Sequence, residues 1–220
     1  MSVQPCEKCE DGYLRQEREG HTVMVECECL KEKKFLAAML RANIDPMYHP
    51  HLFVDAPMPP HSGEQTIVRN KVTEIVTNIR PWVQAGKGMY LYAGDRGTGK
   101  TTHLLLVLKE ALRAGYSVYN IHWMDFLGLM IRDRDEWDVV KDVDVLMIDE
   151  IGKDGSRSET AFPMAGFDYI IRYRISKCKP ILMASNLEPK EFTNLYGSGA
   201  ESLLSSLIVL PVHGSDWRAA

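Results

Sequence analysis

The chain has 220 residues, and 45% of them are hydrophobic, which is enough for the packed core of one domain with a small additional module. The net charge of -4 argues against a protein that grips duplex DNA through overall positive charge, although a ring of subunits could still line a basic channel. No apolar run approaches the roughly 18 residues that a membrane span requires, and the first residues lack the pattern of a secretory signal. We therefore expect a cytoplasmic protein with no membrane contact.

Four of the five cysteines lie near the N-terminus, as the pairs Cys6-x-x-Cys9 and Cys27-x-Cys29. In a reducing cytosol such thiols are poor candidates for disulfides. Two close pairs on either side of a polar, hairpin-like stretch suit one tetrahedral Zn²⁺, which would supply folding energy to a segment without a core. Free or redox-active thiols are the alternative. Cys178 precedes a predicted core strand and is expected to pack there.

A short helix over residues 30–41 follows the cysteines and carries a basic face. The next residues, 43–62, are dense in proline and histidine, which blocks regular structure and indicates a linker on the surface. The sequence thus predicts three parts: a zinc module with its helix over residues 1–42, a linker over 43–62, and a main domain over 63–220, which the motifs described below identify as the ATPase domain.

Helical and strand patterns alternate through the rest of the chain. Periodicity predicts helices over 64–83, 101–114, 123–131 and 165–177, and strands over 89–93, 117–121, 143–148 and 180–184. A last apolar run over 203–212 is expected to span a helix end and an edge strand. Strands that alternate with helices predict an α/β fold with a parallel sheet flanked by helices.

A complete phosphate-loop pattern lies between a predicted strand and a predicted helix. Glycines let the backbone wrap around phosphate, and the helix N-terminus faces its negative charge. Lys100 should neutralise the β- and γ-phosphates, and Thr101 should place its hydroxyl on Mg²⁺. The residues expected to contact ATP are Gly94, Asp95, Arg96, Gly97, Thr98, Gly99, Lys100, Thr101 and Thr102, together with Asp149.

Polar residues end two further predicted strands. Asp149 and Glu150 follow the apolar run that starts at Val143, and we expect them to face the phosphate loop across the tips of adjacent strands. Asp149 would hold hydrated Mg²⁺, and Glu150 could polarise the attacking water as general base. Asn186 ends another strand, where it either orients that water or simply forms a turn.

These motifs, in this order, resemble the DnaC/DnaI/IstB group of AAA+ ATPases. The resemblance covers nearly the whole chain and rests on short segments whose specificity comes from order and spacing. Besides the phosphate loop and the Asp-Glu strand, they are the N-terminal cysteines, Arg41-Ala42-Asn43-Ile44-Asp45-Pro46, Tyr173-Arg174, Lys179-Pro180, Ser185-Asn186-Leu187 and Gly214-Ser215-Asp216-Trp217-Arg218.

The resemblance implies an AAA+ protein that loads the hexameric replicative helicase onto single-stranded DNA. It implies that the N-terminal region touches the helicase, that the ATPase domain self-associates, and that Asn186 and Arg218 are the sensor I and sensor II residues. The helix after residue 122 is expected to pack in the core, while the resemblance offers Trp123 or Arg132 as a contact for DNA bases. A nucleotide-binding adaptor with little hydrolysis, or an IstB-like transposition ATPase, are the alternatives.

One departure from the family pattern concerns the arginine that reaches a neighbouring subunit's nucleotide. Ser202 and Ser206 stand where the family usually carries arginines. Such a finger stabilises transition-state charge, so its absence predicts slow hydrolysis with intact nucleotide binding. Arg157, Arg172 and Arg174 are candidate substitutes, and the sequence does not rank them.

Overall fold

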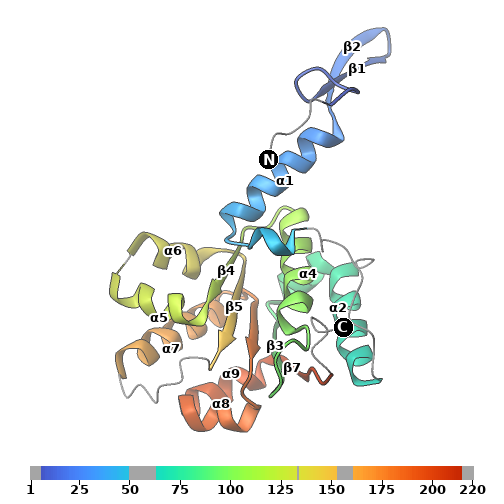
Figure 1. Ribbon diagram of the computed structural model, residues 1–220. Helices are drawn as coiled ribbons and strands as arrows, with labels where there is room; N and C mark the ends of the chain where they lie inside the picture. The colour runs from blue at the N-terminus through green and yellow to red at the C-terminus, as the bar shows by residue number, and fades with distance from the viewer. Residues whose placement is uncertain (1–5, 50–62, 133, 153–160, 215–220) are drawn as a thin grey trace.

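The computed structural model describes residues 6–49, 63–132, 134–152 and 161–214. Their centre is a five-stranded sheet in the order β4-β5-β6-β3-β7, in which all four neighbouring pairs are parallel. The strands are β3 (Gly88–Tyr92), β4 (Val118–His122), β5 (Val145–Ile151), β6 (Ile181–Ser185) and β7 (Leu207–Pro211). The predicted α/β class is confirmed, and β7 lies at an edge as expected (Figure 1).

Strand residues alternate between two hydrophobic cores, one on each face of the sheet. Met89 and Leu91 of β3 belong to one core, and Tyr90 between them belongs to the other. The first core is closed by α2 (Gly63–Thr77), α3 (Ile79–Ala85) and α4 (Lys100–Arg113). The second is closed by α5 (Trp123–Arg132), α6 (Arg134–Asp142), α7 (Ala161–Ser176), α8 (Pro189–Tyr196) and α9 (Ser198–Ser205).

Two local features differ from the sequence prediction, and the role of Trp123, for which two alternatives were open, is decided by its burial. The single helix expected over 64–83 is broken at Asn78, whose φ of -118° and ψ of 39° are not helical. Helices α6 and α8 were not predicted, because each is shorter than the roughly 11 residues over which helical periodicity can be recognised. Trp123 has no exposed surface, which confirms its core role and removes it as a contact for DNA bases.

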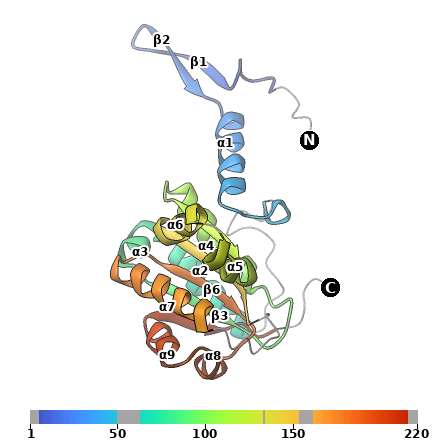
Figure 2. The same ribbon diagram turned by 90° about the vertical axis from the view of Figure 1, so that its left-hand side faces the viewer.

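The N-terminal residues form an arm that stands away from the sheet (Figures 1 and 2). Its far end is a hairpin of β1 (Tyr13–Arg18) and β2 (His21–Glu26), and its shaft is α1 (Glu28–Arg41). The base of the arm is buried: Met39, Ala42 and Ile44 belong to the core that also contains α2 and α4. A short 3-10 helix, η1 (Pro46–Tyr48), follows within the expected linker, and residues 50–62 lie outside the described residues.

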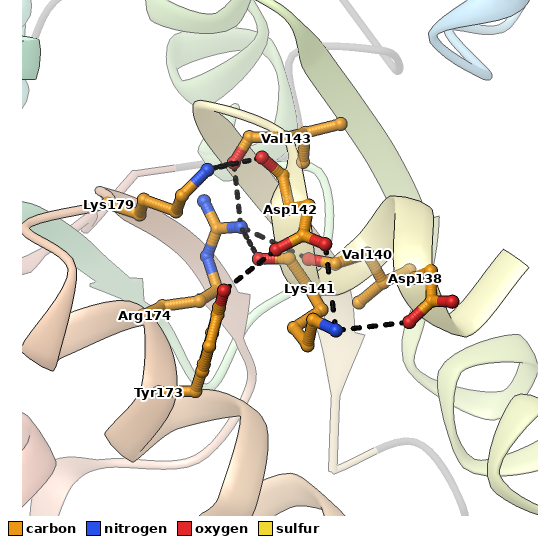
Figure 3. Close-up of polar contacts among 8 residues, drawn as sticks. All are labelled: Asp138, Val140, Lys141, Asp142, Val143, Tyr173, Arg174 and Lys179. Atoms are coloured by element: carbon orange, nitrogen blue, oxygen red, sulfur yellow. Dashed lines mark hydrogen bonds and ion pairs between the residues drawn. The ribbon is translucent and has the colours of Figure 1, made fainter.

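Arg174 on α7 is a buried guanidinium without exposed surface. It donates five hydrogen bonds to backbone carbonyls, those of Val140, Lys141, Val143, Asp144 and Pro180 (Figure 3 shows its surroundings). Burial lowers its pKa to about 9. The side chain therefore fastens the end of α6 and the start of β5 to the start of β6. It also supplies hydrogen-bond donors to carbonyls that water cannot reach.

We predict that Arg174→Met lowers the free energy of unfolding by about 3–5 kcal/mol, because it leaves several buried carbonyls without a donor. Arg172→Met is the matched control, since Arg172 lies on the same helix but is exposed, and its partner among the described residues is Asp168. Its cost should stay within about 0.5 kcal/mol. Urea unfolding of both variants checks this, and similar losses in the two would show that the carbonyl contacts are unimportant.

Candidate functional site

The phosphate loop connects the end of β3 to the start of α4. Gly97 and Gly99 have φ values of 72° and 92°, in the left-handed region that a side chain disfavours. Gly99 is the N-cap residue of α4, so the helix begins at Lys100 directly after the loop. The positive end of the helix dipole and its unpaired amides are thereby placed at the loop, as an anion requires.

Lys100 keeps its ammonium inside this loop. Its Nζ donates to the carbonyls of Asp95 at 3.0 Å and Ala93 at 3.4 Å, and the residue is only 9% exposed. Thr98 and Thr102 are also buried. A phosphate group is a stronger partner for an ammonium than a neutral carbonyl is, so the residues present fit a bound triphosphate.

Thr101 and Asp149 are brought together from different elements. The Thr101 hydroxyl donates to Asp149 Oδ1 at 3.1 Å, and Asp149 is 4% exposed. Burial raises the pKa of this carboxyl, while hydrogen bonds from Thr101 and from the Glu150 amide act in the opposite direction. A hydroxyl and a carboxylate at this distance are the oxygen ligands that Mg²⁺ prefers.

The sequence suggested that the strands carrying the loop and the acid pair are adjacent. In the structure they are not. β6 lies between β3 and β5, so Asn186, directly after β6, is placed between the two halves of the site. The prediction of adjacency was wrong because strand order depends on crossovers that local sequence patterns do not specify.

Glu150 occupies an irregular position in β5. The register between β5 and β6 shifts between Ile148 and Ile151, and Glu150 has a φ of 64°, which is strained for a residue with a side chain. The positive φ interrupts the regular extended backbone of β5 at this residue. His122, at the end of β4, places its Nδ1 4.0 Å from Glu150 Oε2. Sequence reasoning missed His122, although its place at the end of a strand was a usable signal.

These residues surround one cavity of about 370 Å³. Its walls come from the loop and α4, from the ends of β4, β5 and β6, and from η1. The lining residues are Met47, Tyr48, Arg96, Gly97, Thr98, Gly99, Lys100, Thr101, Thr102, His122, Asp149, Glu150, Ala184, Ser185 and Asn186.

Most of the predicted site residues thus come together in this cavity. Of the others, Gly94 and Asp95 belong to the loop but do not line the cavity, while Arg218 lies outside the described residues. Met47 and Tyr48 were missed, because nothing local marks a proline-rich segment as part of a site.

The three candidate finger arginines fare differently. Arg174 is excluded, because it is buried and bound to five carbonyls of its own chain. Arg172 is exposed and pairs with Asp168, so it stays a candidate. Arg157 lies outside the described residues. Ser202 and Ser206 are both exposed on or next to α9.

The four N-terminal cysteines gather at the base of the hairpin. Strand pairing brings Tyr13 opposite Glu26, which places the residues before β1 beside those after β2. All four sulfur atoms lie within 4.8 Å of one another, and the Cys9 and Cys29 sulfurs are 3.4 Å apart. A tetrahedral zinc site with Zn–S bonds of about 2.3 Å requires sulfur atoms separated by about 3.8 Å. The donor set and its spacing therefore fit one Zn²⁺.

The pKa values of the thiols differ: that of Cys6 is lowered and that of Cys29 is raised. The backbone amide of Lys8 helps lower the pKa of Cys6 to about 7, whereas hydrogen bonding with Cys9 helps raise the pKa of Cys29 to about 12. A divalent cation would favour all four thiolates. Cys178 is exposed rather than packed in the core, so that prediction was wrong: the residue has a φ of 50° in the turn before β6.

None of the described helices combines the length and the hydropathy needed to cross a membrane. By sequence, the chain matches no family model and no curated protein. The described fold, in contrast, is similar to solved structures of replication proteins.

A crystal structure of the DnaC helicase loader aligns with a TM-score of 0.64 at 19% identity, over 77% of this chain and 100% of that one. A putative primosome component from Streptococcus pyogenes serotype M3 aligns with a TM-score of 0.60 at 20% identity, over 81% and 97% of the two chains. AMPPCP-bound DnaA from Aquifex aeolicus aligns with a TM-score of 0.61 at 19% identity, over 78% of this chain and 53% of DnaA. The chain thus has an AAA+-like fold with structural similarity to DnaC, DnaI and the AAA+ domain of DnaA.

Proposed function

We propose that this protein is an ATP-dependent loader of the hexameric replicative helicase onto single-stranded DNA, acting in the cytoplasm during replication initiation. The observation that carries the proposal is the joined set of Lys100, Thr101, Asp149 and Glu150 around one cavity. It occurs in a fold similar to that of the DnaC helicase loader.

Each residue of the cavity has a distinct task in this proposal. Lys100 and the amides of the loop bind the phosphates, and Thr101 with Asp149 holds the metal ion that accompanies them. Mg²⁺, when bound, neutralises the charge that develops on the transferred phosphoryl group. Glu150 accepts a proton from the attacking water, and Asn186 orients that water. Arg218 completes the set as the sensor II residue.

The arm is proposed to bind the helicase. Its shaft, α1, exposes Leu36 and Leu40, one helical turn apart, with Lys33 next to them. Exposed leucines at this spacing form the apolar stripe by which a helix packs into a groove of a partner. Self-association of the ATPase domains and contact with single-stranded DNA complete the proposal.

A nucleotide-binding adaptor with little hydrolysis is the second candidate. The observation in its favour is the pair of serines, Ser202 and Ser206, at the positions expected for finger arginines. Steady-state ATP hydrolysis with and without single-stranded DNA separates the two, because a loader should be stimulated and an adaptor should stay near background. An IstB-like transposition ATPase, the third candidate, would not capture a helicase.

We predict that Lys100→Ala and Glu150→Gln separate binding from hydrolysis. Lys100→Ala should weaken the binding of a fluorescent ATP analogue at least about 30-fold, because it removes a buried cation from the phosphates. Glu150→Gln should retain that affinity and lower turnover about 100-fold or more, since the base is lost. Unchanged affinity in Lys100→Ala would contradict the assignment of the loop.

The cysteine cluster should hold one zinc ion. Elemental analysis of natively purified protein should give about one Zn²⁺ per chain, and Cys9→Ser should reduce this ratio because it removes one of the four ligands. Cys178→Ser is the control and should leave the ratio unchanged, because Cys178 is exposed and far from the cluster in sequence. A ratio near zero in the wild-type protein would refute the zinc site.

Capture of a hexameric replicative helicase tests the role of the arm. The double variant Leu36→Asp, Leu40→Asp should lose at least about 10-fold in helicase binding, because the apolar stripe of α1 then carries two charges. Leu195→Asp, which changes an equally exposed leucine on α8, should bind as the wild type does. Equal binding by all three proteins would argue against α1 as the helicase contact.

A further inference from the structure

The short helix η1 joins the arm to the nucleotide cavity. Met47 and Tyr48 line the same cavity as the phosphate loop, although more than forty residues of sequence separate them from it. Met47 is 64% exposed, so its side chain lies at the surface of the cavity and is available to a ligand. Most of the other lining residues are polar, and the thioether of Met47 and the phenol ring of Tyr48 add apolar surface beside them.

The same segment is fastened to the ATPase body by partly buried polar contacts. Lys109 of α4 donates from Nζ to the carbonyl of Tyr48. Asn43 and Asn120 bond each other's backbone: Asn43 Nδ2 lies 2.9 Å from the Asn120 carbonyl, and Asn120 Nδ2 lies 3.2 Å from that of Asn43. The backbone N–H of Asn120 also donates to the carbonyl of Ala42 at 2.9 Å. These contacts hold the base of the arm against α4 and β4.

Lys109 fixes the position of η1 against α4. The residue is 1% exposed, and burial lowers its pKa to about 8. A buried ammonium needs its acceptor, so a shift of η1 away from α4 has a cost in free energy. Farther along α4, the Arg113 guanidinium lies 5.3 Å from the centre of the Phe35 ring on α1. Helix α4 therefore begins at the phosphate loop and also carries the residues that hold the base of the arm (Figure 1).

We propose that η1 is a nucleotide-responsive joint: the base of the bound nucleotide lies against Met47 and Tyr48 and thereby fixes the arm on the ATPase body. A planar base packs well against a thioether and an aromatic ring, while its phosphates stay in the loop. A nucleoside triphosphate then bridges the joint and α4. The inference rests on the proposed binding of ATP, and it adds that occupancy of the site controls the partner-binding arm.

Tripolyphosphate separates the base contact from the phosphate contact. Tripolyphosphate and ATP should both bind to the wild-type protein, and ATP should bind more tightly because it also has a base. Met47→Ala should weaken ATP about 5- to 10-fold, as expected for the loss of one side of a stacked base, and leave tripolyphosphate unchanged. Met124→Ala is the matched control, because Met124 is 56% exposed and does not line this cavity. An unchanged ratio of the two affinities in Met47→Ala overturns the base contact.

Hydrogen exchange tests the coupling to the arm. A non-hydrolysable ATP analogue should slow amide exchange over residues 39–49 at least about 5-fold, and tripolyphosphate should not. Lys109→Met should still bind the analogue but lose most of this protection, because η1 is no longer tied to α4. Equal exchange with both ligands overturns the inference even when binding is normal. Failure of the wild-type protein to bind either ligand would instead overturn the proposed function together with it.

Discussion

The hydrogen bond between the Thr101 hydroxyl and Asp149 Oδ1 joins the two halves of the site. It forms because the strands of a parallel sheet all end at the same edge, so the loop after β3 and the acids of β5 meet across the end of β6. The phosphate loop, the acid pair and Asn186 depend on this arrangement. Without the crossovers that bury both faces of the sheet, no local motif would place them in one cavity.

Strain and burial are concentrated where the chemistry is expected. Glu150 adopts a left-handed conformation at a bulge, and the carboxylate next to it is almost fully buried. Such features cost free energy and persist only when the surrounding structure fixes them. Here β4 and β6 pair with β5 on its two sides, and the bulge lies at the carboxyl end of β5, where Glu150 Oε2 is 4.0 Å from His122 Nδ1.

Two buried cations organise the structure around the site in a similar way. Arg174 connects α6, α7 and the segments that lead into β5 and β6 through carbonyls, and Lys109 holds η1 against α4. Both side chains have a lowered pKa because of burial, and both bind backbone oxygens. Buried charges in such positions specify one arrangement of the chain, because any other arrangement would leave them without acceptors.

The sequence by itself determined the features that depend on neighbouring residues. The glycine and lysine pattern of 94–101, the alternation of helices and strands, the Asp149-Glu150 pair and the two cysteine pairs are local, and they predicted the fold class and most of the cavity. Only the tertiary structure decided that β6 lies between β3 and β5, that Arg174 is buried, and that Met47 and Tyr48 line the same cavity as the phosphate loop. These depend on contacts between distant segments, whose free energy is set by packing and by the pairing of buried polar groups, and no short stretch of sequence contains both partners.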